Sequence, residues 1–321
     1  MNGIAQVPHA INNHYDRAML MRAIPSFLHT RFAQVRDIPR NNTNVIKFRR
    51  YGSLTAATTA LTEGVTPAGS TLSVTDVTAT VLQYGDFIAL TDYVMMTTLD
   101  PILMETAEVL GEQMGDTLDQ LTRDVLAAGT SVSYGGDATA RIEVAAGDLI
   151  TADLIRKAVR TLKRQNAKRI TRQINPSTGI ATEGVKAGFI GIVHPDVAYT
   201  LETLGSDGWV GIEKYSNQAT VMEDEIGKLG YVRFLETNNA KVFEDAGASG
   251  IDVHCVLILA QEAYAISRIS GRSVENIIKA LGSGGTEDPL NQRATSGWKA
   301  TFVAKILNNA FMHRIEVAAA A

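Results

Sequence analysis

Residues 100–129 read DPILMETAEVLGEQMGDTLDQLTRDVLAAG, the longest helical pattern in a chain of 321 residues. Apolar or small side chains recur along it about every 3.7 residues, the period of an α-helix. They are Leu103, Ala107, Leu110, Met114, Leu118, Leu121 and Val125. Asp100 suits the N-cap, Pro101 the first helical position, and Gly129 a stop. The pattern predicts a helix over 100–128, about 42 Å long, which far exceeds the usual length in a globular domain.

Acidic residues occupy the other face of this helix. They are Glu105, Glu108, Glu112, Asp116, Asp119 and Asp124. Their spacing could group catalytic carboxylates, but a solvated or inter-subunit face is the commoner cause of such a pattern.

The segment before the helix, residues 47–93, is rich in Thr, Ala, Ser and Val. Thr71–Thr75 alternates polar and apolar residues, the period of a β-strand, and turn-forming residues occupy 67–70. The pattern predicts a long β-hairpin whose tip, near 63–70, makes contacts through Glu63, Val65 and Pro67. Large apolar residues are few, so the hairpin must lean on something else.

Residues 1–46 are polar and irregular, with one expected helical piece at 15–22. The first fifty residues carry eight Lys or Arg and two Asp or Glu, whereas the whole chain has a net charge of -4. Residues 1–46 therefore resemble an extended basic arm with little core of its own, which meets either an anionic partner or the acidic parts of sister subunits.

A second basic region follows the long helix, where residues 155–181 contain no acid. Its helix is expected from about Thr151 to Asn166. Basic side chains of both regions are candidates for contact with neighbouring subunits or with DNA phosphates. They are Arg36, Arg40, Lys47, Arg49, Arg50, Arg156, Lys157, Arg160, Lys163, Arg164, Lys168, Arg169 and Arg172. The sequence leaves the two readings about even.

The rest of the chain has an α/β pattern. Buried strands are expected at 189–193 and 253–259, a helix from His194–Asp196 onward with Asp196 as its N-cap, and a short helix at 273–281. One or two strands are expected over 298–315.

No arrangement of residues predicts a catalytic, cofactor-binding or metal site. The single cysteine, Cys255, lies in an apolar strand pattern and is expected to be a core thiol. The glycines of 282–285 lack the spacing of a phosphate-binding loop. No two of the six histidines are spaced as a ligand pair. His194 follows a strand, where catalytic residues often lie, but no nucleophile or base accompanies it.

Three stretches resemble a known family: AGFIGIVHPD (187–196), GKLGYVRFLET (227–237) and GTEDPLNQR (285–293). They are similar to phrases of the podovirus-type major capsid proteins of tailed bacteriophages, which have the Hong Kong 97-like fold. The order of elements resembles that α+β fold too. The resemblance implies an N-terminal arm (1–48), an E-loop hairpin (49–93), a P domain (94–185) with the spine helix, an inserted A domain (186–262) and a return to the P domain (263–321).

The resemblance also implies partners and a place. The chain would self-assemble into hexamers and pentamers of an icosahedral virion shell around double-stranded DNA. Its partners would be a portal protein and, in some relatives, scaffolding and decoration proteins, with assembly in the host cytoplasm and no membrane contact. Some relatives crosslink through an E-loop lysine; residues 51–91 contain none, so noncovalent contacts are expected to hold the shell.

Two other functions stay open at this point. One is another self-assembling virion component, a tail tube or decoration protein. The other is a soluble α/β enzyme with a site near His194 and Asp196.

Overall fold

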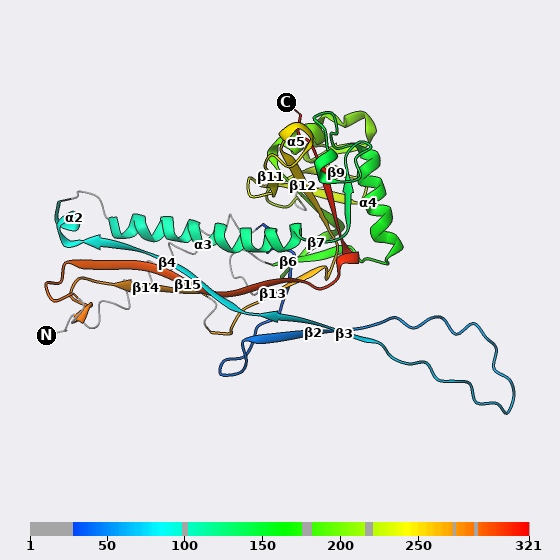
Figure 1. The fold of residues 1–321 in the computed structure, drawn as a ribbon, viewed down its shortest axis with the longest axis horizontal. Helices are drawn as coiled ribbons and strands as arrows, with labels where there is room; N and C mark the ends of the chain where they lie inside the picture. Colours follow the sequence, from blue (N-terminus) through cyan, green and yellow to red (C-terminus); the bar gives the residue numbers. More distant parts are fainter. Residues whose placement is uncertain are drawn as a thin grey trace.

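A 26-residue helix, α3 (Ile102–Ala127), lies along a five-stranded sheet in this computed structural model (Figure 1). The structure describes residues 28–97, 102–174, 182–215, 221–271, 274–285 and 288–320. The apolar face of α3 buries Leu110, Met114 and Leu118 against Trp298 and Phe302 of the sheet. This confirms the predicted helix, while Asp100 and Pro101 lie outside the described residues.

The five-stranded sheet gathers strands from the whole length of the chain. In order they are β1 (Gln34–Val35), β13 (Tyr264–Ser267), β15 (Arg293–Ile306) and β14 (Val274–Lys279), with β4 (Leu82–Thr91) also paired to β15. The helix predicted at 273–281 is therefore wrong, because Val274–Lys279 pairs antiparallel with residues 295–300 of β15. Those ladder hydrogen bonds outweigh the weak local preference of a six-residue segment for helix.

The predicted hairpin is present, but its paired part is shorter than expected. β2 (Val45–Tyr51) pairs antiparallel with β3 (Val74–Thr80), and no strand lies in the 22 residues between them. The strand predicted from Thr71 thus begins at Val74. β4, which follows β3 directly, leaves the hairpin for the five-stranded sheet and ends at the short helix α2 (Asp92–Thr97).

A nine-stranded sheet forms the core of the compact end of the molecule (Figure 1). Its main path is β5 (Val132–Tyr134), β16 (Met312–Val317), β12 (Val253–Leu259), β7 (Thr182–Val193), β10 (Val232–Glu236), β9 (Glu225–Leu229) and β8 (Trp209–Gly211). β11 (Val242–Phe243) pairs with β12, and β6 (Ile170–Ile174) pairs with β7. The strands predicted at 189–193, 253–259 and 298–315 are confirmed, the last as two strands.

Two helices pack on this sheet because each carries a complete apolar stripe. α4 (Ala152–Arg164) buries Ile155, Val159 and Leu162, and Thr151 caps it by accepting a hydrogen bond from the amide of Leu154 (3.3 Å). α5 (Pro195–Thr203) buries Val197 and Leu201. Short 3₁₀ turns link the elements at Arg141–Glu143, Gly205–Asp207, Ile212–Lys214, Ala248–Gly250 and Asn309–Phe311.

Gly191 of β7 shows why a glycine stands in the middle of a buried strand. A Cβ at this position would lie 2.5 Å from the ring of Phe234 on the neighbouring strand β10. Phe234 is fully buried, so the ring fills the space that the missing side chain leaves.

The end of the predicted arm belongs to the core of this same chain. Leu28 and Phe32 are buried, and Asp119 of α3 accepts hydrogen bonds from the His29 amide (2.7 Å) and pairs with His29 Nδ1 (2.6 Å). The expectation that the arm has little core of its own is therefore wrong for residues 28–32 and Ile38, whereas residues 39–44 are exposed. Asp119, predicted on the polar face of α3, is instead fully buried. The helical piece predicted at 15–22 lies outside the described residues.

The nine-stranded sheet includes segments on both sides of the predicted A domain (186–262), among them β5, β6 and β16. The division of the chain at these boundaries stays a prediction. Among the described residues, no helix has the length and apolarity needed to cross a bilayer.

Candidate assembly surfaces

The loop between β2 and β3, called here the hairpin tip (residues 52–73), extends away from the rest of the molecule (Figure 1). Every residue from 53 to 73 is exposed, including Glu63, Val65 and Pro67. Leu61 exposes 77% of its surface, and Leu54 and Leu72 more than half of theirs. In the single chain these three leucines leave apolar surface of the tip exposed to solvent.

A second exposed apolar surface lies at the far end of the five-stranded sheet. Phe87 of β4 is 66% exposed, and Tyr93 and Met96 of α2 are both more than 70% exposed. In Figure 1, α2 and the hairpin tip are at opposite ends of the long axis. Apolar surface at both ends fits a subunit that meets different neighbours at its two extremities.

The outer face of α4 and the start of β6 form the basic face: Arg156, Lys157, Arg160, Lys163, Arg164, Lys168, Arg169 and Arg172. All eight are exposed. Lys157 pairs with Asp153 (2.8 Å), Arg156 donates to the carbonyl of Asp207, and Lys163 and Arg169 lie over the ring of Tyr231. Among the described residues, Arg164, Lys168 and Arg172 have no carboxylate at salt-bridge distance, so their charges face outward.

The predicted basic residues of the arm meet at the root of the hairpin. Arg36, Lys47, Arg49 and Arg50 line one hollow of about 420 Å³. Arg49 pairs with Asp76 across the β2–β3 ladder (3.1 Å). The hydrogen bond to the Asp76 carboxylate is the main cause that raises the pKa of Arg49 above its usual value. Arg40 lies apart from them, near Gly271.

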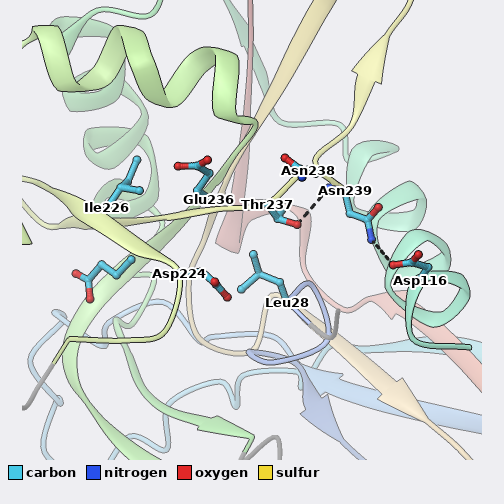
Figure 2. A pocket seen from close by; sticks show the side chains of 9 residues that line it. Leu28, Asp116, Asp224, Ile226, Glu236, Thr237, Asn238 and Asn239 are labelled. Carbon is cyan, nitrogen blue, oxygen red and sulfur yellow. Dashed lines mark hydrogen bonds between the residues drawn. The ribbon is translucent and has the colours of Figure 1, made fainter. Parts of the chain in front are cut away.

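An acidic hollow of about 660 Å³ opens between α3 and the nine-stranded sheet (Figure 2). Its carboxylates are Asp116, Asp224, Glu225 and Glu236. Asn239 donates to Asp116 (3.2 Å) and holds one wall in place. Burial, and secondarily the charge of Glu223, raises the pKa of Asp224. Sequence reasoning missed this hollow because its acids come from α3, from β9 and the turn before it, and from β10, which only the fold brings together.

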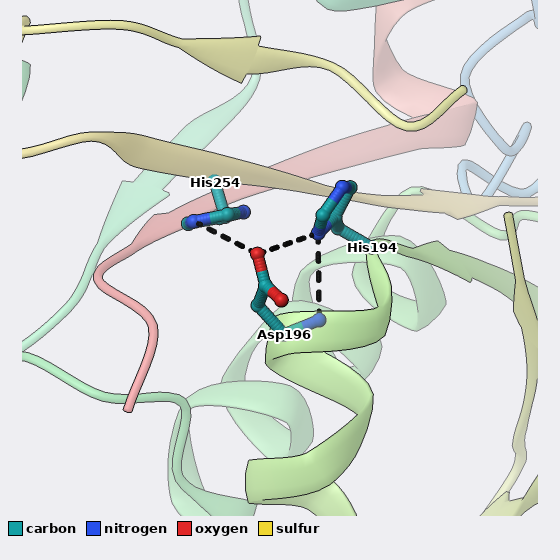
Figure 3. A group of neighbouring side chains, drawn as sticks. All are labelled: His194, Asp196 and His254. Atoms are coloured by element: carbon teal, nitrogen blue, oxygen red, sulfur yellow. Dashed lines mark hydrogen bonds and ion pairs between the residues drawn. The ribbon is translucent and has the colours of Figure 1, made fainter. Parts of the chain in front are cut away.

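The cluster near His194 differs from the sequence prediction. The N-cap of α5 is His194, not Asp196, and the His194 ring accepts a hydrogen bond from the Asp196 amide (3.4 Å). The Asp196 carboxylate lies 2.9 Å from His194 Nδ1 and 4.0 Å from Nε2 of His254 on β12 (Figure 3). Burial, and then the neighbouring His194, lowers the pKa of His254. The third member of the cluster is thus a second imidazole.

Cys255 is fully buried in β12, as predicted. Burial raises the pKa of its thiol to about 12. A thiol held neutral in this way is a poor nucleophile, which agrees with its reading as a core residue.

The element order, the long helix across a sheet and the projecting hairpin define the Hong Kong 97-type class of shell subunits. Solved structures agree at low sequence identity. The capsid of Ralstonia phage GP4 is 14% identical, with a TM-score of 0.69, over 89% of this chain and 87% of that one. The cyanophage Pam1 capsid is 13% identical, with a TM-score of 0.65, over 94% and 92%. The holo-SrpI encapsulin complex of Synechococcus elongatus is 7% identical, with a TM-score of 0.54, over 90% and 86%.

The family profile described as "Phage capsid protein" matches residues 74–312. The chain therefore belongs to the phage capsid protein family, and it is a major capsid protein, a shell subunit of the virion. No curated protein matches it significantly by sequence.

Proposed function

We propose that this chain forms hexamers and pentamers that close into an icosahedral head around double-stranded DNA, with a portal protein at one vertex. Assembly would take place in the host cytoplasm, and scaffolding and decoration proteins are possible further partners. The observation that carries the proposal is the hairpin tip, whose leucines are exposed in the single chain. Each tip would lie on a neighbouring subunit and gain there the apolar burial it lacks.

Burial of the three tip leucines supplies a useful free energy of association. Each fully buried leucine contributes about 1.5–3 kcal/mol, so three contribute several kcal/mol at every subunit contact. A closed shell repeats that contact in every copy. The summed free energy of association of the shell is therefore large, although each single contact contributes little.

The test is a matched pair of triple variants. Leu54, Leu61 and Leu72 are changed together to Ser in one variant and to Met in the other. We expect the Met variant to form closed shells in electron micrographs, because Met retains the apolar volume. We expect the Ser variant to remain as unassembled folded chains or capsomers. Shells of normal yield from the Ser variant would refute the role of the tip, and tubes in place of shells would support the tail-tube alternative.

The basic face has two possible roles in such a head, contact with packaged DNA or salt bridges to a neighbouring subunit. Arg164, Lys168 and Arg172 are exposed and have no carboxylate at salt-bridge distance among the described residues, which favours phosphate contact. Changing all three to Gln would leave shell assembly intact and lower the DNA content of the particles if they contact DNA. Failure of assembly would instead identify them as partners of a neighbour's carboxylates.

The enzyme alternative rests on His194 and Asp196, to which the structure adds His254. Family and fold are those of structural proteins.

A further inference from the structure

Three metal-ligating side chains meet at one edge of the nine-stranded sheet: His194, Asp196 and His254, called here the His–Asp–His cluster (Figure 3). His194 directly follows β7 as the N-cap of α5, Asp196 lies in the first turn of α5, and His254 comes from the neighbouring strand β12. His194 and His254 are far apart in the sequence, and the antiparallel pairing of β7 with β12 brings them together.

The spacing of the cluster suits one small cation. One potential ligand atom from each residue lies within 4.8 Å of the others. Zinc binds imidazole nitrogen and carboxylate oxygen at about 2.0–2.2 Å, so ligand atoms of a tetrahedral site lie about 3.4 Å apart. Asp196 already lies 2.9 Å from His194 and 4.0 Å from His254. Both distances are close to the spacing of ligand atoms around one such ion.

His254 supplies a second, independent observation. Its side chain is 7% exposed, and its Nδ1 atom is buried with no hydrogen-bond partner among the described residues. The Nε2 atom faces Asp196 at 4.0 Å, which is beyond hydrogen-bond distance. Neither nitrogen of this buried ring has a hydrogen-bond partner among the described residues, so the Nε2 lone pair that faces Asp196 is available to a metal ion.

The donor set identifies the class of ion. Two imidazoles with one carboxylate favour Zn²⁺ and related first-row ions such as Co²⁺ and Ni²⁺, whereas Mg²⁺ and Ca²⁺ prefer oxygen ligands alone. Asp196 is 54% exposed and His194 22%, so the cluster is open to solvent and water can fill the remaining coordination positions.

The amino end of α5 works against a cation, because its unpaired amides carry partial positive charge. The carboxylate of Asp196 stands at that same end and offsets it. The affinity of the cluster for a cation should therefore depend strongly on the charge of this one residue.

We propose that the His–Asp–His cluster is a binding site for one Zn²⁺-class divalent ion, which joins the β7–α5 junction to β12. Bound metal would link two strands of the sheet through their side chains and would hold the exposed first turn of α5 against β12. The inference does not depend on the shell proposal, since all three ligands come from one chain.

The test uses purified full-length protein and Co²⁺ as a spectroscopic probe, with Zn²⁺ as competitor. We expect saturable binding of one Co²⁺ per chain, with visible absorption bands that Zn²⁺ removes. Asp196→Asn should weaken binding at least tenfold, and His254→Gln should abolish the bands. Asp153→Asn is the matched control, because Asp153 is also an exposed acid in the first turn of a helix, α4; it should bind Co²⁺ like the parent.

Asp196→Asn is the decisive variant because its side chain is half exposed and the fold does not depend on it, which circular dichroism would verify. Equal Co²⁺ affinity in the parent and in Asp196→Asn would overturn the proposal, and so would the absence of saturable binding to the parent.

Discussion

His313 should make the folded chain less stable in mild acid. The ring is 4% exposed, and its two nitrogens lie 2.8 Å from the hydroxyls of Ser131 and Ser133. Burial, and secondarily the charge of Arg314, lowers the pKa of His313 from 6.5 to about 4. The unfolded chain therefore binds a proton that the folded chain does not at any pH between these two values.

The sign and size of the effect follow from linkage. Above about pH 6.5, His313 causes no loss of the free energy of unfolding. The loss grows as the pH falls toward the pKa of the folded state and stays constant below that pKa. At about 1.4 kcal/mol per pH unit, lowering the pH from about 7.5 to about 5 should cost about 2 kcal/mol through this residue alone.

The assay is urea unfolding at both pH values, on chains kept unassembled by the three Leu→Ser changes in the hairpin tip. His313→Gln is uncharged at both pH values and can still bond the two serines, so it should lose about 2 kcal/mol less than the parent on acidification. Ser133→Ala keeps the buried ring and should retain the pH dependence at lower overall stability. An identical loss in the parent and in His313→Gln would refute the reasoning.

Three further results are expected. Arg141→Met should cost about 1.5–3 kcal/mol in the same urea assay, because Arg141 donates twice to the buried carboxylate of Glu316 (2.8 Å each), which keeps Arg314 as its second partner; Lys157→Met at an exposed ion pair should cost under about 1 kcal/mol. Met114→Ala in the core of α3 should cost about 2–5 kcal/mol, whereas the half-exposed Val109→Ala should be nearly neutral; equal costs would contradict the packing of α3 on β15. Shells boiled in detergent should run as single chains, since residues 51–91 contain no lysine for crosslinking; a ladder of multimers would show covalent links.

Long-range features were the least predictable from the sequence. The segment 273–281 was predicted as a helix because its local pattern allowed one, but its partner strand in β15 made it β14. His29 and Asp119 were assigned to an arm and to a solvated helix face, yet they form a buried pair. In each case the deciding contact comes from a segment more than ten residues away, which local periodicity does not report.

The candidate surfaces also differ in how far the sequence predicts them. The basic face was predictable because eight of its cations fall within seventeen residues of one helix and strand. The acidic hollow and the His–Asp–His cluster were not, since their members come from separate strands and helices.

By itself, the sequence determined the long helix through the apolar period of residues 100–129, the exposed hairpin through its lack of large apolar side chains, and the family resemblance through three short phrases. Only the tertiary structure decided that Asp119 of α3 is buried against His29, where 274–279 pairs, and that His194 and His254 meet. The physical reason is that periodicity and composition reflect the burial of each residue along its own element, whereas strand pairing and side-chain clusters depend on which distant elements become neighbours.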